Sequence, residues 1–99
     1  MISLIQAIEK VEHELTRMTL SGSPQMSIMK GRTIEREFGW IFFYNSTEYL
    51  TTGNPSSMLA GNGPLIVGKS DGQLYHTGSA QPLEFYIKEI FANNMLFRH

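Results

Sequence analysis

The chain has 99 residues, of which 41% are hydrophobic and 17% charged, with a formal net charge of −1 and no cysteine. These values are typical of one small globular domain, which we expect to span residues 1–99. The absence of cysteine excludes disulfides, thiolate metal sites and a cysteine nucleophile. Lys and Arg are scattered singly along the chain, so the sequence lacks the basic stripe of a nucleic-acid-binding protein.

Membrane and secretory signals are also missing from the sequence. No apolar run approaches the roughly 18 residues needed to span a bilayer, and Met1–Leu4 lack the basic start of a signal peptide. We therefore expect a cytoplasmic protein that does not bind membranes.

The first predicted element is an N-terminal amphipathic helix, because apolar residues recur at spacings of three and four. Ser3 and Gln6 have the spacing of a capping box, which marks the start of the helix. Gly22 and Pro24 end it, since neither sustains helical structure. The residues expected on the apolar face are Ile5, Ile8, Val11, Leu15 and Met18.

Two strands are expected next. Residues 26–37 alternate loosely and are interrupted by Gly31, which indicates a long, bent or bulged edge strand. Residues 40–44 are apolar on both faces of the expected strand, as in a central strand that is covered on each side. Residues 46–63 predict a long irregular connection with a turn of helix around residues 55–59.

The second half of the chain predicts a hairpin and a helix. Residues 64–69 and 73–77 are strands joined by a tight Ser-Asp-Gly turn. Pro82 is expected to open a C-terminal helix that Asn93-Asn94 stop, leaving the tail from Met95 with little support. The predicted fold is therefore α+β: an N-terminal helix, a four-stranded antiparallel sheet and a C-terminal helix, with both helices covering one face of the sheet.

Residues 63–70 match the phosphate-loop pattern G-x-x-x-x-G-K-[ST] letter for letter. A true loop of this kind follows a strand and opens a helix, so that amides at the helix N-terminus meet the phosphates. Here the apolar strand lies inside the motif, Pro64 removes an amide donor, and Asp71-Gly72 turns the chain into another strand. We interpret the match as accidental and expect no cofactor.

Titratable residues offer no convincing catalytic or metal site. His13 lies one helical turn beyond Glu9, but a third ligand is missing, so an exposed helical pair is favoured over a metal site. Asp71 is explained as a turn former. Glu35 and Glu37 alternate onto one face of the first strand, where they either protect a sheet edge or form a small acidic patch for a basic partner.

Trp40 begins the central strand beside a glycine. We favour a place in the core for its ring, with an exposed anchor for a partner as the alternative.

Several stretches together resemble the YrhB-like family, also called the immunity protein 35 family. The order and gaps match over roughly residues 26–90. The stretches are Phe38–Tyr44, Tyr49-Leu50, Thr52–Asn54, Leu59–Val67, Asp71-Gly72 and Thr77–Ile87.

The resemblance implies an immunity protein without enzymatic activity, which binds and neutralises a cognate bacterial toxin encoded beside it. The resemblance does not imply which toxin is bound, because family members differ in the toxin they counter. From position and side-chain type, the candidate partner-binding residues are Glu35, Glu37, Trp40, Glu48, Asn62 and Asp71.

A second hypothesis is a chaperone-like or homo-oligomeric scaffold protein. It rests on a chaperone-like role associated with the same family, and on the apolar strand 40–44, which two helices alone must cover. A nucleotide-binding protein built on residues 63–70 is the third and weakest hypothesis.

Overall fold

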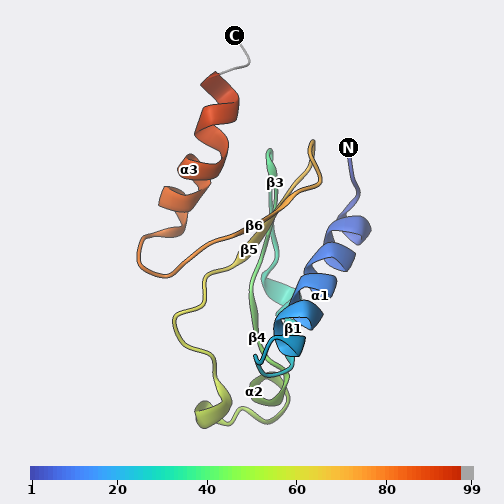
Figure 1. Cartoon of the computed structure of the whole chain (residues 1–99), viewed down its shortest axis with the longest axis vertical. Coiled ribbons are helices and arrows are strands. Elements are labelled where there is room, and N and C mark those ends of the chain that lie inside the picture. The colour runs from blue at the N-terminus through green and yellow to red at the C-terminus, as the bar shows by residue number, and fades with distance from the viewer. Residues whose placement is uncertain (97–99) are drawn as a thin grey trace.

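The computed structural model of the chain describes residues 1–96. It has an N-terminal helix, antiparallel sheets and a C-terminal helix, which confirms the predicted α+β class (Figure 1). The elements in chain order are α1 (Leu4–Leu20), β1 (Met26–Ile28), the 3-10 turn η1 (Lys30–Arg32), β2 (Ile34–Arg36), β3 (Gly39–Phe42), β4 (Tyr44–Ser46), α2 (Thr47–Thr52), the 3-10 turn η2 (Pro55–Ser57), β5 (Leu65–Gly68), β6 (Leu74–His76) and α3 (Leu83–Leu96).

The strands form two antiparallel sheets. A four-stranded sheet has the order β2-β3-β5-β6, and β1 pairs with β4 in a smaller two-stranded sheet. The first predicted strand is indeed bent, because η1 divides it into β1 and β2. Its partner is divided at Phe43, so β4 continues beyond β3 toward α2 (Figure 1). The result is one long hairpin whose outer strand is the continuous segment β1–η1–β2.

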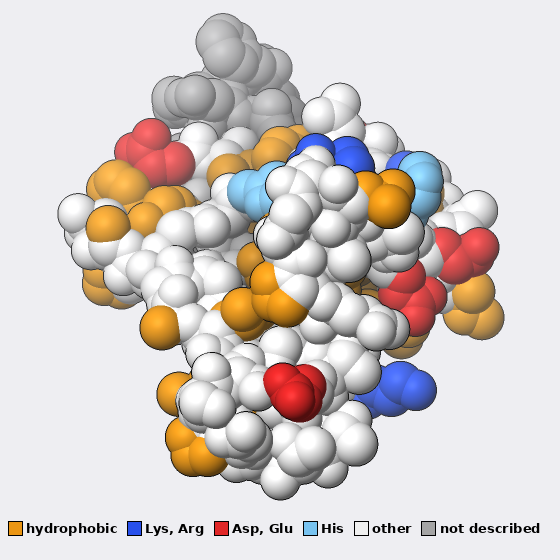
Figure 2. All heavy atoms as spheres, turned by 60° about the horizontal axis from the view of Figure 1, so that its bottom comes forward, with side chains coloured by type: hydrophobic (Ala, Val, Ile, Leu, Met, Phe, Trp, Pro, Cys, Tyr) orange, Lys and Arg blue, Asp and Glu red, His pale blue; other side chains and the backbone are white. Residues whose placement is uncertain are grey.

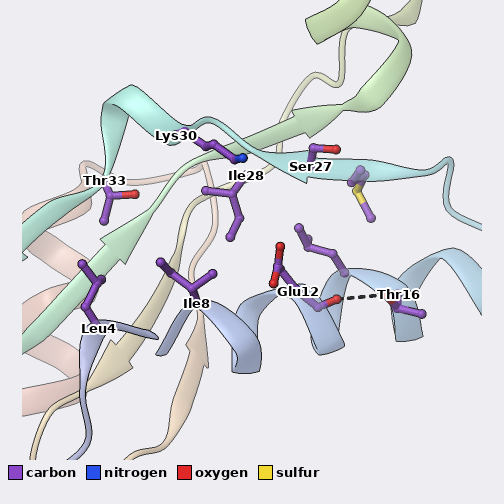
Figure 3. A pocket seen from close by; sticks show the side chains of 10 residues that line it. Leu4, Ile8, Glu12, Thr16, Ser27, Ile28, Lys30 and Thr33 are labelled. Carbon is purple, nitrogen blue, oxygen red and sulfur yellow. Dashed lines mark hydrogen bonds between the residues drawn. The ribbon is translucent and has the colours of Figure 1, made fainter. Parts of the chain in front are cut away.

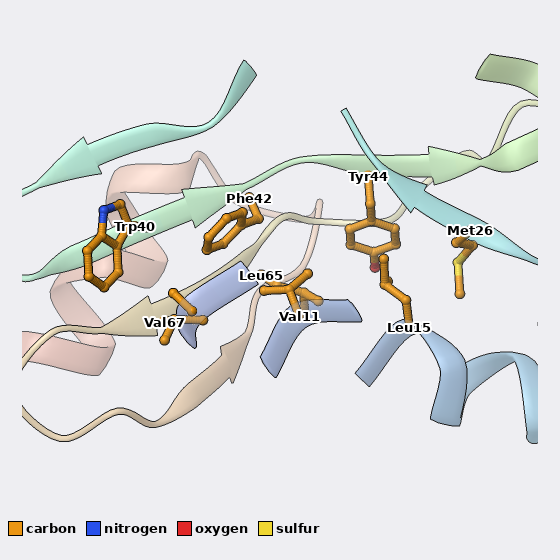
Figure 4. Packing of buried hydrophobic residues seen from close by; sticks show 9 residues of the cluster. Val11, Leu15, Met26, Trp40, Phe42, Tyr44, Leu65 and Val67 are labelled. Atoms are coloured by element: carbon orange, nitrogen blue, oxygen red, sulfur yellow. The ribbon is translucent and has the colours of Figure 1, made fainter. Parts of the chain in front are cut away.

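The expectation that both helices cover one face of the sheet is wrong. Alternate residues of β3 point to opposite faces, and each face has its own core. Phe42 packs in the cluster that includes Val11 of α1, whereas Ile41 packs with Ile87 of α3. Figure 1 shows the sheet between the two helices, and Figure 4 shows the core on the α1 side. A central strand that is apolar on both faces requires a cover on each side.

Helix α1 begins as predicted, and its expected apolar face is confirmed except at Ile5: Val11 and Leu15 are buried, and Ile8 and Met18 pack against the same core. Ser3 and Gln6 form the capping box with bonds of 3.2 and 2.9 Å. Ile5, which was expected to face the core, has 70% of its surface exposed, whereas Ala7 is fully buried. The face of α1 that packs against the sheet therefore contains Ala7, whereas Ile5 faces solvent.

Two other helical predictions need correction. Helix α2 lies inside the stretch expected to be irregular: Ser46 accepts a hydrogen bond from the Tyr49 amide at its start, and Gly53 ends it with φ 73°. The expected turn of helix around residues 55–59 is present as η2. Asn93-Asn94 do not stop α3, which continues to Leu96. The last three residues of the expected unsupported tail lie outside the described residues.

Candidate partner-binding site

The six predicted partner-binding residues are spread along the molecule. The β2–β3 and β5–β6 turns meet at one end, where Gly39 pairs with Gly68 and the Lys69 amide donates to the Phe38 carbonyl over 2.9 Å. Glu35, Glu37, Trp40 and Asp71 belong to the strands and turns of this end. Glu48 belongs to α2 at the other end (Figure 1), whereas Asn62 lies in the loop before β5, beside Tyr44 of β4. The structure therefore does not bring the six residues into one site.

Trp40 is buried in the core on the α1 side, with 5% of its surface exposed. The Nζ atom of Lys69 lies 5.3 Å from the centre of its ring and 2.7 Å from a carboxylate oxygen of Glu35. The favoured assignment of Trp40 to the core is thus confirmed, and its ring is not an exposed anchor for a partner.

The predicted acidic patch also contains cations. Glu35 lies on β2, but Glu37 lies in the turn after it, and both line a shallow hollow together with Arg36 and Lys69. Lys69 pairs with Glu35, and Arg36 pairs with Glu84 of α3 at 3.3 Å. Charges of both signs therefore mark this end of the sheet.

Asp71 acts within its own hairpin. Its carboxylate accepts hydrogen bonds from the Gln73 amide and the Tyr75 hydroxyl, at 3.0 and 2.5 Å. The second bond raises the pKa of Tyr75 to about 12, because the neighbouring carboxylate and burial both favour the neutral phenol. The interpretation of Asp71 as a turn former is confirmed.

Glu48 and Asn62 likewise make local contacts. A carboxylate oxygen of Glu48 accepts a hydrogen bond from the Ser57 hydroxyl, and the Asn62 side-chain amide donates to the Tyr44 carbonyl over 3.2 Å. Figure 2, in which the α2 end comes forward, shows hydrophobic side chains in separate groups and charged side chains of both signs between them. Neither a continuous acidic surface nor one large apolar patch appears on this face.

The structure also contains a groove that the sequence did not predict. It lies between α1 and the β1–η1 segment and has a volume of about 580 Å³ (Figure 3). Its apolar side chains come from both walls, and polar residues stand beside them. The lining residues are Leu4, Ile8, Glu12, Leu15, Thr16, Met26, Ser27, Ile28, Lys30 and Thr33.

Two opposite charges stand on the two walls of this groove. Glu12 belongs to α1 and Lys30 to η1, and both are exposed. Within the residues that the structure describes, neither side chain forms an ion pair. The groove thus combines an apolar lining with one unpaired acid and one unpaired base.

The family of this chain is shown by its similarity to known proteins. The family model described as "Immunity protein 35" matches residues 5–89. The chain belongs to the immunity protein 35 family. The uncharacterized protein YrhB of Escherichia coli (strain K12) is 35% identical over 89 residues, which cover 90% of this chain and 88% of that protein. No solved structure matches the chain at a comparable significance.

The loops that carry the immunity protein 35 resemblance are joined to each other in the structure. The Thr77 hydroxyl donates to the Pro64 carbonyl over 2.6 Å, and the Ser79 hydroxyl donates to the Gly61 carbonyl over 2.9 Å. A Cβ atom on Gly63 would lie 2.4 Å from the Gly78 carbonyl oxygen, so this close approach requires glycine. These family residues therefore define the architecture of the loops.

The phosphate-loop pattern lies in the structural context that the sequence predicted, a strand followed by a tight turn. Residues 65–68 of that pattern are strand β5, and a turn follows them in place of a helix. Among the described residues, no group of three His, Asp or Glu side chains is placed to hold a metal ion. No helix within residues 1–96 is long and apolar enough to cross a membrane.

Proposed function

We propose that this protein is an immunity protein that binds a cognate bacterial toxin in the cytoplasm and neutralises it by direct contact, without catalysis. The observation that carries the proposal is the match to the immunity protein 35 family, which extends from the second residue of α1 into α3. The 35% identity to YrhB over nearly the whole chain supports the same family assignment.

The partner-binding surface that we propose is the edge segment, defined as residues 26–36. It comprises β1, η1 and β2, and it is the outer strand of the long hairpin. All three residues of β2 are exposed, and β2 pairs on one side only, with β3. Exposed strand edges are common sites of protein association, since their main chain and side chains are both accessible.

Glu35 lies within this segment on β2, and Glu37 follows it in the turn. Glu35 lies opposite Trp40 in the β2–β3 register, so it projects to the face that α1 covers elsewhere. Its side chain is 64% exposed even though it pairs with Lys69. We assign both glutamates to steering and orienting the toxin, because exposed charges at an interface act mainly on association rate and specificity.

Strand residues 40–44 offer little apolar surface for the scaffold hypothesis, because among them only Phe43 is partly exposed. Trp40, Ile41, Phe42 and Tyr44 are each at most 6% exposed. The burial of this strand therefore favours toxin binding over a chaperone built on an exposed apolar strand.

Co-expression tests the proposed function. The toxin encoded beside this protein's gene is expressed in a host without other immunity genes, with and without this chain, and growth is measured. We expect the chain to restore growth and to co-purify with the toxin. Growth arrest despite soluble expression of the chain would contradict the proposal. A chain that rescues growth without binding the toxin would contradict neutralisation by direct contact.

A further inference from the structure

We propose that the groove between α1 and β1 receives an extended segment of the toxin, which adds to the free edge of β1 as a further strand. This inference rests on the proposed function and specifies its contact surface. The segment has alternating side chains, with apolar residues facing the groove, a basic residue near Glu12 and an acidic residue near Lys30.

The hydrogen bonds of β1 show which of its main-chain groups are free. The Thr47 amide donates to the Gln25 carbonyl over 2.9 Å, and the Met29 amide donates to the Phe43 carbonyl over 2.8 Å. In an antiparallel pair, hydrogen-bonded positions alternate with positions whose amides and carbonyls point away from the partner strand. Met26 and Ile28 occupy the second kind of position, opposite Ser46 and Tyr44.

These outward main-chain groups are unpaired among the described residues. Strand β1 pairs with β4 alone, and neither Met26 nor Ile28 takes part in any other main-chain hydrogen bond within residues 1–96. The side chains of the same two residues line the groove. In Figure 3, β1 passes in front of β4 and lies across the groove from α1, and the edge of β1 that faces away from β4 is the one that carries these groups. An added strand would therefore bond to this edge and direct alternate side chains toward α1.

The groove suits the alternate side chains of such a strand. Leu4 of α1 is 43% exposed, and Leu4, Ile8 and Ile28 supply apolar surface on the two walls (Figure 3). The volume of about 580 Å³ accommodates a few side chains. Main-chain pairing with pockets for alternate side chains is how strand addition combines affinity with specificity.

Charge complementarity determines the kind of segment. Glu12 on the helix wall and Lys30 on the β1–η1 wall stand without ion-pair partners in the described part of the chain. A segment with only apolar side chains would leave both charges beside an apolar contact, which opposes binding. A segment that carries a basic and an acidic residue in addition to its apolar ones would pair with both.

Titration calorimetry of the full chain with a catalytically inactive variant of the cognate toxin tests this inference. Ile8→Glu places a charge inside the groove and should weaken binding at least about tenfold, the scale of loss at a central interface residue. Ile5→Glu is the matched control, because Ile5 lies on the same helix, is 70% exposed and does not line the groove. It should bind within about twofold of the parent chain.

Hydrogen exchange distinguishes strand addition from other modes of docking. On complex formation, the amides of Met26 and Ile28 should become protected. If Ile8→Glu does not fold, Lys30→Glu at the rim replaces it, with Lys10→Glu on the exposed side of α1 as its control. Lys30→Glu should then weaken binding and Lys10→Glu should not.

The possible results separate the inference from the proposed function. Tight toxin binding that neither groove substitution affects, or that leaves the Met26 and Ile28 amides unprotected, overturns the inference and leaves the function standing. Absence of any binding by the parent chain overturns both. Concentration-dependent protection of the same amides in the toxin-free protein would show that a second copy occupies the edge, which also overturns the inference.

Discussion

The ammonium nitrogen of Lys69 lies 2.7 Å from a carboxylate oxygen of Glu35, so an ion pair joins the β5–β6 turn to edge strand β2. Lys69 is mostly buried, with its side chain 20% exposed, whereas Glu35 is 64% exposed. Because its Glu35 side is open to solvent, this ion pair contributes about 1 kcal/mol or less to stability. Glu35 is therefore available to a partner without being needed for folding.

Replacing Glu35 and Glu37 with lysine tests their assignment to partner binding. The double variant should change the free energy of unfolding by less than about 1 kcal/mol, because both carboxylates are exposed. Its affinity for the toxin should fall at low ionic strength and approach that of the parent chain as salt screens the charges. Calorimetry at two salt concentrations measures this. Glu89→Lys on the exposed side of α3 is the control, and an unchanged low-salt affinity of the double variant would refute the assignment.

Gly39 should be intolerant of any side chain, because a Cβ atom there would lie 2.0 Å from the Val67 carbonyl oxygen of the neighbouring strand. Gly39→Ala forces β3 and β5 apart and should cost about 1–3 kcal/mol in urea denaturation. Gly31→Ala is the control, since a Cβ atom at that position meets nothing within 4 Å. Equal stabilities of the two variants would show that the close approach of β3 to β5 is not as described.

The bond from the Thr77 hydroxyl to the Pro64 carbonyl ties together the two loops that identify the family. Thr77→Val keeps the shape of the side chain but leaves that half-buried carbonyl without its partner, which should cost about 1 kcal/mol. Thr51→Val removes an exposed helical hydroxyl and should change stability by less than about 0.5 kcal/mol. Thermal denaturation of both variants measures the difference, and a Thr77→Val variant as stable as the parent would contradict it.

Glu14 should make folding sensitive to acid. The hydrogen bond from Arg17, followed by that from His76, lowers the pKa of this carboxyl from its ordinary value of 4.5 to about 2. Because the pKa is lower in the folded state, the stabilisation is complete above pH 4.5 and is lost as the pH falls toward 2.

Urea denaturation between pH 2 and pH 6 tests whether the free energy of unfolding falls as the pH is lowered. Glu14→Gln should flatten the decline in stability below pH 4.5, whereas Glu9→Gln on the same helix should not. A parent chain and a Glu14→Gln variant with parallel pH profiles would contradict the account.

Local sequence patterns correctly predicted the elements that begin or end with a capping box or a tight turn. Ser3 and Gln6 marked the start of α1, and the Ser-Asp-Gly turn marked the β5–β6 hairpin. Helix α2 was missed because its residues are mostly polar, although Ser46 as a cap and Gly53 as a stop were visible signals. Ile5 fits the helical spacing but faces solvent, because the position of the sheet selects the buried row, and a small residue such as Ala7 is easily overlooked.

The candidate site could not be predicted in the same way. The groove joins α1 to residues of β1 and η1, and periodicity carries no information about which side of a sheet a helix covers. The free edge at Met26 and Ile28 depends on the β1–β4 register, which the hydrogen bonds of the folded chain determine. The glutamates were recognisable as exposed charges, but their pairing with nearby cations was not.

Direct titration of the purified chain with its cognate toxin, with toxin activity measured in the same samples, tests the central claim. We expect a saturable complex of fixed stoichiometry, with residual toxin activity that falls in proportion to the fraction of toxin bound. Toxin that stays fully active in the presence of an excess of folded chain, with no heat of binding at two temperatures, would contradict it.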